Sequence, residues 1–286
     1  MNTTTIRPIT VFSVEDFGMP IPQFVQANAP LFYDLPLDPY DAKKEQIMLL
    51  QSTLDLNCTD ILYKYYLGEL DFSAIEQYYK MLPEKKQVEF DKIKPYRRRG
   101  VSRYSCNKSS SGWNARRIPT KPFSQTYAKI SENHFDIRAL PRIFTEIDEK
   151  SVSSDMFKTL LFGLIGKIAE YHPDISELDI TVHHVLVETT KERVTSNSPE
   201  GIHQDGYDYI VSALVVERCA ILGGESQIFD DDKTTKILTT TLQPGHGILQ
   251  PDKDTHLWHK VTPIYVKEGM DIGFRSSIGF DIGLVR

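Results

Sequence analysis

Two histidines and one aspartate in the last third of the chain have the types and the spacing of a metal site. His203 and Asp205 are two residues apart in the run Gly201–Gly206, so in an extended backbone both side chains point to the same face. His259 lies on a later predicted strand. Two imidazoles and one carboxylate form the facial triad that holds non-haem Fe(II) and leaves positions open for a co-substrate and O2. The sequence therefore predicts a metal centre made of these three residues.

A cation and a hydroxyl follow on the last predicted strand. Arg275 and Ser277 are two residues apart, so their side chains share a face of that strand. A guanidinium binds a carboxylate through charge-assisted, bidentate hydrogen bonds that fix its orientation. We therefore expect Arg275, with Ser277 as a helper, to bind the distal carboxylate of a dicarboxylate.

These motifs resemble those of the Fe(II)/2-oxoglutarate-dependent dioxygenases, whose pattern is His-x-Asp/Glu, a long gap, His, and then Arg or Lys about one strand later. Within that family the chain looks like the bacterial branch of free amino acid hydroxylases that includes L-isoleucine 4-hydroxylase. The closer resemblance is carried by the segments Val182–Val185, Thr190–Arg193, Ser198–Gly206, Gly223–Ser226, His259–Pro263 and Phe274–Arg275. It covers about residues 95–286 and is sharp after about residue 180, whereas the helical first third matches the branch less well.

The resemblance implies a double-stranded β-helix core, Fe(II) on the triad, and 2-oxoglutarate and O2 as co-substrates. Arg275 would then bind the far carboxylate of 2-oxoglutarate. The implied reaction is hydroxylation of an unactivated C–H bond of a free amino acid, with release of succinate and CO2. Asp205 favours hydroxylation over halogenation, because the halogenases of this family carry a small residue at that position and bind chloride there.

Four other histidines compete for a role. His246 lies between glycines in a turn, which favours a surface position, and His256 has the wrong strand parity relative to His259. His183 shares a face with Val185 and is expected to look into the core or to contact substrate. His184, on the other face, is open to the same two interpretations.

Alternatives remain for the substrate and for the class of protein. The arginines between Arg97 and Arg103 either line a solvated strand or bind the carboxylate of an amino acid. The same oxidation on a peptide or carrier-bound substrate needs an open groove instead of a closed pocket. A non-catalytic, cupin-like binding protein keeps the metal without turnover. A hydrolase or isomerase with the same triad explains Arg275 poorly.

Hydrophobic periodicity predicts the elements that position these residues. Residues 1–40 are rich in proline and are expected to be extended or looped, and residues 107–145 to be long connections. Residues 41–91 have a helical pattern, and an amphipathic helix is expected around Met156–Ile168. Strands are predicted over 97–106, 180–188, 208–217, 225–229, 236–241, 246–250, 256–262 and 271–281. We therefore expect a mainly β fold with flanking helices: a helical region, residues 1–94, packed on a sandwich or jelly-roll core, residues 95–286. The resemblance implies the jelly roll.

Composition excludes several classes of protein. The chain has 286 residues, a formal net charge of −6, and only Arg97–Arg99 as a basic run, which argues against nucleic-acid binding. The cysteines Cys58, Cys106 and Cys219 form no Cys-x-x-Cys pair, so we expect no disulfide framework and no thiolate zinc site, and Cys219 is expected to be buried. The apolar stretches are too short to span a membrane, and residues 1–10 carry no signal-like core, so a cytoplasmic location is expected.

Overall fold

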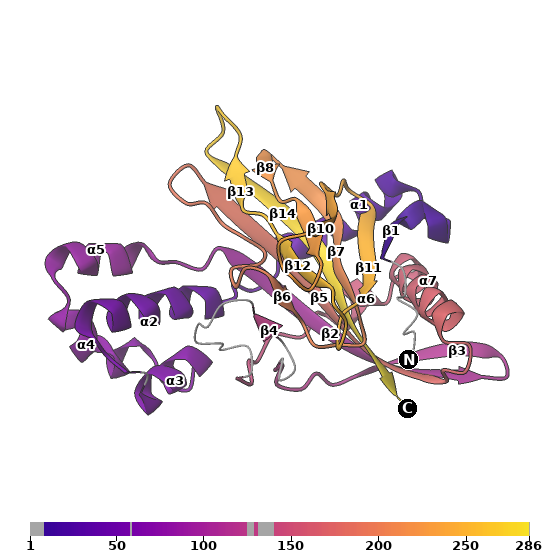
Figure 1. Cartoon of the computed structure of the whole chain (residues 1–286), viewed down its shortest axis with the longest axis horizontal. Coiled ribbons are helices and arrows are strands. Elements are labelled where there is room, and N and C mark those ends of the chain that lie inside the picture. Colours follow the sequence, from indigo (N-terminus) through magenta and orange to yellow (C-terminus); the bar gives the residue numbers. More distant parts are fainter. Residues whose placement is uncertain (1–8, 58, 125–128, 131–139, 286) are drawn as a thin grey trace.

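The strands of this protein form two main sheets of unequal size (Figure 1). The computed structural model describes residues 9–57, 59–124, 129–130 and 140–285. The seven-stranded sheet contains, in order across it, β1 (Thr10–Ser13), β11 (His246–Pro251), β7 (Tyr209–Cys219), β14 (Ile272–Val285), β5 (Glu177–Thr190), β2 (Arg97–Ser109) and β3 (Gly112–Ile118). The five-stranded sheet contains β10 (Lys236–Thr240), β9 (Ser226–Phe229), β12 (Trp258–Val261), β6 (His203–Gln204) and β4 (Lys129–Ile130). A third, two-stranded sheet pairs β13 (Ile264–Val266) with β8 (Ile221–Gly223).

The connectivity from β5 onward is that of a jelly roll. The chain passes from β5 in the large sheet to β6 in the small one, back to β7, then to β9 and β10, and again across for β11, β12 and β14. Strands that cross between two antiparallel sheets in this way form a double-stranded jelly roll. The predicted mainly β fold with flanking helices is confirmed, and each strand predicted after residue 179 is present with shifted ends.

The two sheets pack on each other through an apolar cluster. Ala213 and Val215 of β7 and Ile248 of β11 meet Ile228 of β9 across the space between the sheets. Side chains alternate along a strand, so the residues next to Ala213, Val215 and Ile248 in the sequence point to the outer face of the large sheet. Throughout, the inner face is the face of the large sheet that looks toward the small one.

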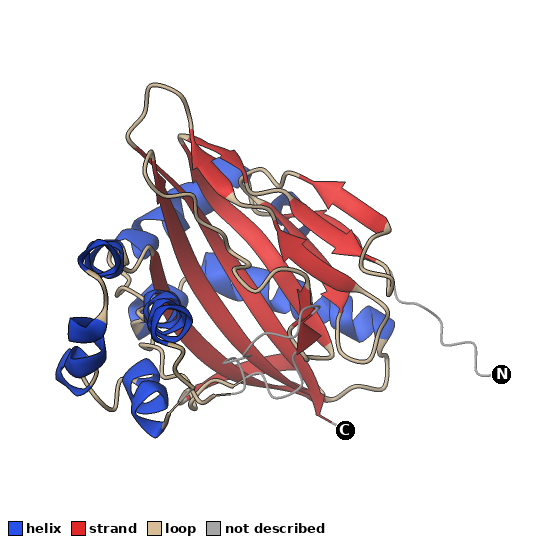
Figure 2. Ribbon diagram, turned by 60° about the vertical axis from the view of Figure 1, so that its left-hand side comes forward, coloured by secondary structure: helices blue, strands red, loops and turns tan. Residues whose placement is uncertain are grey.

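Helices cover the outer face of the large sheet. Helix α7 (Asp155–Tyr171) buries Leu160, Leu164 and Ile168 against a cluster that includes Ile278 and Phe280 of β14. The predicted amphipathic helix is thus confirmed. Figure 2 shows helices behind the large curved sheet, with the small sheet on the other side.

A second group of helices lies beside the sheets, on the left in Figure 1. It consists of α2 (Tyr40–Leu54), α3 (Asp60–Leu67), α4 (Glu76–Met81) and α5 (Glu84–Lys92). Their buried residues, such as Leu50, Leu62 and Tyr66, form one cluster with Val101 of β2 and with Phe123 and Phe144. The helical prediction for residues 41–91 is therefore confirmed, whereas the domain boundary at residue 94 stays a prediction.

Two expectations about irregular segments are wrong. Residues 10–33 are not simply looped: β1 joins the large sheet, and α1 (Ile21–Tyr33) buries Phe24, Ala29 and Phe32. Pro22 lies in the first turn of α1, where a helix needs no N–H donor, so its presence did not exclude the helix. Within residues 107–145, β3 forms an antiparallel hairpin with β2. A short helix, α6 (Glu149–Val152), and two 3-10 turns, η1 (Val14–Phe17) and η2 (Phe72–Ala74), complete the described elements.

The predictions about the cysteines are confirmed by the structure only in part, and no helix fits a membrane span among the described residues. Cys106 and Cys219 are unbridged, and Cys58 lies outside the described residues. Cys219 is exposed at the end of β7, so the prediction that it is buried is wrong. Within the described ranges, no helix combines the length and the apolar composition that a membrane crossing requires.

Gly223, the last residue of β8, provides a test of this packing. It has φ +76°, and a Cβ there would lie 2.1 Å from the Pro263 carbonyl oxygen. Gly223→Ala should therefore add overpacking of about 1–3 kcal/mol to the left-handed strain of about 1–2 kcal/mol. The matched control is Gly269→Ala, at φ +81° with nothing within 4 Å. Denaturant unfolding should show the larger loss for Gly223→Ala, and equal losses would contradict the packing described.

Candidate metal centre

Strand pairing in the small sheet brings the two candidate histidines together. β12 pairs antiparallel with β6, and His259 is directly opposite His203. Residues directly opposite each other in an antiparallel pair have close Cβ atoms on one face. The two imidazole ring centroids are 4.2 Å apart.

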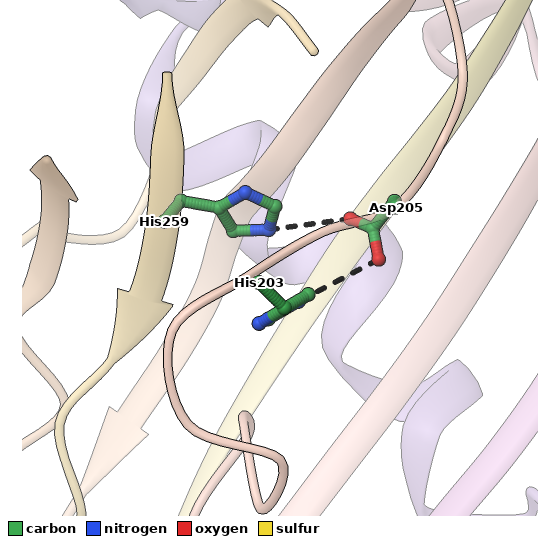
Figure 3. A group of neighbouring side chains, drawn as sticks. All are labelled: His203, Asp205 and His259. Atoms are coloured by element: carbon green, nitrogen blue, oxygen red, sulfur yellow. Dashed lines mark ion pairs between the residues drawn. The ribbon is translucent and has the colours of Figure 1, made fainter. Parts of the chain in front are cut away.

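Asp205 completes the cluster from the segment that follows β6. Its Oδ2 atom is 3.2 Å from Nε2 of His259, and its Oδ1 atom is 3.5 Å from Nε2 of His203 (Figure 3). One ligand atom from each of the three residues lies within 4.8 Å of the others. An ion with bonds of about 2 Å to nitrogen and oxygen fits among such atoms. The structure therefore brings together the three residues that the sequence singled out.

In both histidines an oxygen atom lies beside the imidazole nitrogen that faces away from the cluster. Nδ1 of His203 lies 2.9 Å from the carbonyl oxygen of Gly201, so Nδ1–H donates and Nε2 is left to face the cluster. Nδ1 of His259 lies 3.6 Å from Oδ1 of Asp252, which leaves its Nε2 for the cluster. A metal-ligating histidine needs this kind of orientation.

Asp252 is a residue that the sequence reasoning missed. It is fully buried, and its Oδ2 atom accepts a 2.7 Å hydrogen bond from the backbone N–H of Gly206. Burial, with the nearby negative charge of Asp205, raises the pKa of Asp252 to about 7. The only signal in the sequence was an acidic residue just after the predicted strand 246–250.

Gln204 was also missed, although it lies inside the motif. Its side-chain amide donates to the carbonyl oxygens of Asp252, Thr255 and Leu257, at 3.3, 3.0 and 2.8 Å. These bonds hold the segment that leads into β12. Gln204 therefore fixes the position of His259 relative to His203.

The electrostatics keep Asp205 ionised. Burial alone would raise the pKa of its carboxyl group, but hydrogen bonding and proximity to His203 and His259 hold the pKa well below its usual range. A carboxylate must be deprotonated to bind a metal ion. Glu200 has an oxygen 3.1 Å from Nε2 of His203, yet the converging group comprises only the three residues named above among those described.

Arg275 lies on the inner face of β14 with its charge fully buried. β14 pairs with β5 without a register shift, so Arg275 and Ser277 share a face, opposite to Ile278 and Phe280. The three guanidinium nitrogens have no hydrogen-bond partner among the described residues. Burial, and secondarily Arg218, lowers the pKa of Arg275 to about 9. A buried cation with open donors fits a bound carboxylate, and Ser277, 6% exposed, lies beside it.

The competing histidines lie elsewhere. His256 is near Asp230, at 3.9 Å, and Nδ1 of His246 is 3.1 Å from the carbonyl oxygen of Pro244. His184 is buried on the outer face, between Phe32 and Phe157. His183 faces the inner side of the large sheet, where it bonds to Arg99 and Asp281.

Fold and site together define a jelly-roll protein with a two-histidine, one-carboxylate cluster beside a buried arginine. The family model described as 2OG-Fe dioxygenase matches residues 76–281, and the chain belongs to this family. It is therefore a 2-oxoglutarate-dependent dioxygenase, and it uses Fe(II), 2-oxoglutarate and O2. Comparison with curated protein sequences gave no significant match.

Solved structures share the fold at low sequence identity. A bsmA homolog from Methylobium petroleophilum PM1 has a TM-score of 0.63 at 16% identity, over 96% of this chain and 88% of that chain. IDO from Bacillus thuringiensis has a TM-score of 0.51 at 14% identity, over 84% of this chain and 96% of that chain. These likenesses support the fold.

The contact between Asp252 and His259 generates a prediction about metal affinity. Asp252→Asn keeps the size of the side chain but loses the carboxylate that faces the imidazole. We expect Fe(II) or Co(II) to bind about 10–100-fold more weakly, as for other residues that orient metal-ligating histidines. The control is Asp254→Asn, two residues away and exposed. Titration calorimetry under anaerobic conditions measures both, and an unchanged affinity in Asp252→Asn would remove the orienting role.

Proposed function

We propose that this protein hydroxylates an unactivated C–H bond of a free amino acid, with His203, Asp205 and His259 holding Fe(II). The observation that carries the proposal is the convergence of these three side chains in a jelly roll that also buries Arg275. Bound iron, with 2-oxoglutarate and O2, supplies the oxidising power, and 2-oxoglutarate is converted to succinate and CO2. The protein binds and orients the reactants.

Arg275 is proposed to fix the far carboxylate of 2-oxoglutarate. Its guanidinium is buried without a partner among the described residues, so a carboxylate would supply the missing acceptor. Such a charge-assisted, bidentate pair sets both position and orientation. Ser277, on the same face of β14, is proposed as a second hydrogen-bond donor to this carboxylate.

Hydroxylation is favoured over halogenation by the presence of a carboxylate at position 205. Both oxygens of Asp205 lie near the candidate histidines, so this side chain would fill the position that a halide needs. The resemblance described above makes the same distinction. The expected product is therefore an alcohol.

A small substrate is favoured by the size of the nearby cavity. The cavity has a volume of about 290 Å³, and its lining includes Phe123, Phe144, Arg103 and Tyr207. This volume is near the lower end, about 300 Å³, of the range for small-molecule sites. Tyr207 is two residues beyond Asp205, so the cavity lies along the segment that supplies the candidate ligand.

Succinate formation tests the proposed function. The full chain, loaded anaerobically with Fe(II), should release succinate when O2, 2-oxoglutarate and one of the common amino acids are added. Alanine at His203, Asp205 or His259 should reduce this release to background, because the ligand set is incomplete. The control is His256→Ala, since His256 lies outside the cluster. Full activity in any of the three variants would overturn the ligand assignment, and stimulation only by peptides would overturn the free amino acid.

A further inference from the structure

Three polar side chains form a chain of hydrogen bonds on the inner face of the large sheet. Arg99 of β2 contacts Nδ1 of His183 through a terminal nitrogen at 2.9 Å. Nε2 of the same imidazole is 3.0 Å from Oδ2 of Asp281 on β14. Because a guanidinium only donates, Nδ1 accepts and Nε2–H donates to Asp281. A cation and an acid are thus held on the two sides of one imidazole ring.

Arg99 differs from the other arginines of β2. Arg97 pairs with Asp41 at 3.1 Å, and Arg103 bonds to Asp179 at 2.9 Å. Arg98 donates to the carbonyl oxygen of Leu35. Arg99 instead contacts the His183 imidazole, and its Nε atom has no hydrogen-bond partner among the described residues. Burial lowers the pKa of Arg99 to about 10, although the nearby negative charge of Asp38 opposes this shift.

Aromatic rings flank this guanidinium. The central carbon of Arg99 is 4.1 Å from the ring centroid of Phe144 and 5.5 Å from that of Phe123. The same two rings lie against Arg142, at 5.6 and 5.3 Å. Rings against its faces hold a guanidinium in one orientation and leave its edges for an acceptor. Phe123 and Phe144 also line the cavity described above.

Two glycines are the neighbours of Asp281 on the inner face of β14. They are Gly279 and Gly283, and a Cβ at either position would make ordinary van der Waals contacts, at 3.6 Å or more. Burial and the negative charge of Asp205 raise the pKa of Asp281 well above its usual range. The positive charge of an ammonium group beside Asp281 would oppose both the effect of burial and that of Asp205 on this pKa.

Asp281 and Arg275 lie far apart on the same face of β14. The negative charge of Asp205 contributes to the pKa shifts of both His183 and Asp281. Arg275 is six residues from Asp281 along β14, a span of about 20 Å at 3.3 Å per residue. Asp281 and Arg275 therefore offer separate anchors on β14.

We propose that Asp281 and Arg99 form a clamp for the ammonium and carboxylate groups of an α-amino acid. The substrate would lie along His183, with its ammonium on Asp281 and its carboxylate on Arg99. In an α-amino acid the two charged groups are separated by one carbon atom, a distance similar to the width of the imidazole between the two anchors. ω-Amino acids and dicarboxylates do not match this spacing and charge pattern. The inference rests on the proposed function and names the residues that select its substrate class.

The test is a binding experiment that needs no turnover. The twenty common amino acids are titrated by calorimetry into the full chain with Fe(II) and 2-oxoglutarate in the absence of O2. The tightest binder is then compared with its des-amino acid, which lacks the ammonium, and with its decarboxylated amine. In the unsubstituted protein each analogue should bind at least about tenfold more weakly, as expected for the loss of one buried charge-assisted hydrogen bond.

Two variants separate the clamp from a purely structural role. Asp281→Asn should weaken the amino acid about tenfold and bind the amino acid and its des-amino analogue equally. Arg99→Gln should bind the amino acid and the decarboxylated amine equally. Asp271→Asn and Arg116→Gln, both at exposed positions, are the matched controls and should behave as the unsubstituted protein.

The outcomes distinguish this inference from the proposed function. If each variant discriminates against both analogues as strongly as the unsubstituted protein does, the clamp is wrong. It is also wrong if iron and 2-oxoglutarate bind but no amino acid does, and the oxygenase chemistry then stands with another substrate. Failure of the unsubstituted protein to bind iron or 2-oxoglutarate would overturn both proposals.

Discussion

The antiparallel register that sets His259 opposite His203 is the constraint on which the site depends. A shift of one residue would turn one of the two imidazoles to the opposite face of the small sheet. β6 has only two residues, so its own hydrogen bonds cannot define this register strongly. The side chain of Gln204 adds three bonds to the segment before β12. The jelly roll thus brings distant residues together, and one buried amide keeps them aligned.

The two faces of the large sheet have opposite chemistry. On its outer face, Ile278 and Phe280 pack against α7, and this apolar layer supplies much of the core. On its inner face the same strands bury Arg275, His183 and Asp281. Buried charges are costly unless they are paired. His183 and Asp281 are paired with each other, whereas Arg275 has no hydrogen-bond partner among the described residues. We propose that the far carboxylate of 2-oxoglutarate supplies that partner.

Strand alternation predicted a sandwich or a jelly roll, and the resemblance selected the jelly roll. The spacing of the His-x-Asp motif and His259 singled out three residues that cluster in the structure. Helix α1 was missed because prolines masked the buried positions Phe24 and Phe32. β6 is too short to leave a pattern of its own. Asp252 and the contact between Arg99 and His183 depend on contacts between distant segments, and no local pattern reports these. The ligand role of the cluster and the role of Arg275 remain predictions.

A crystal structure of the complex with Fe(II) and 2-oxoglutarate, grown without O2, tests the central claim most directly. The account predicts one ion bound by Nε2 of His203, Nε2 of His259 and the carboxylate of Asp205. It also predicts the distal carboxylate of 2-oxoglutarate on the guanidinium of Arg275. An ion bound by other residues, or a distal carboxylate that avoids Arg275, would contradict it.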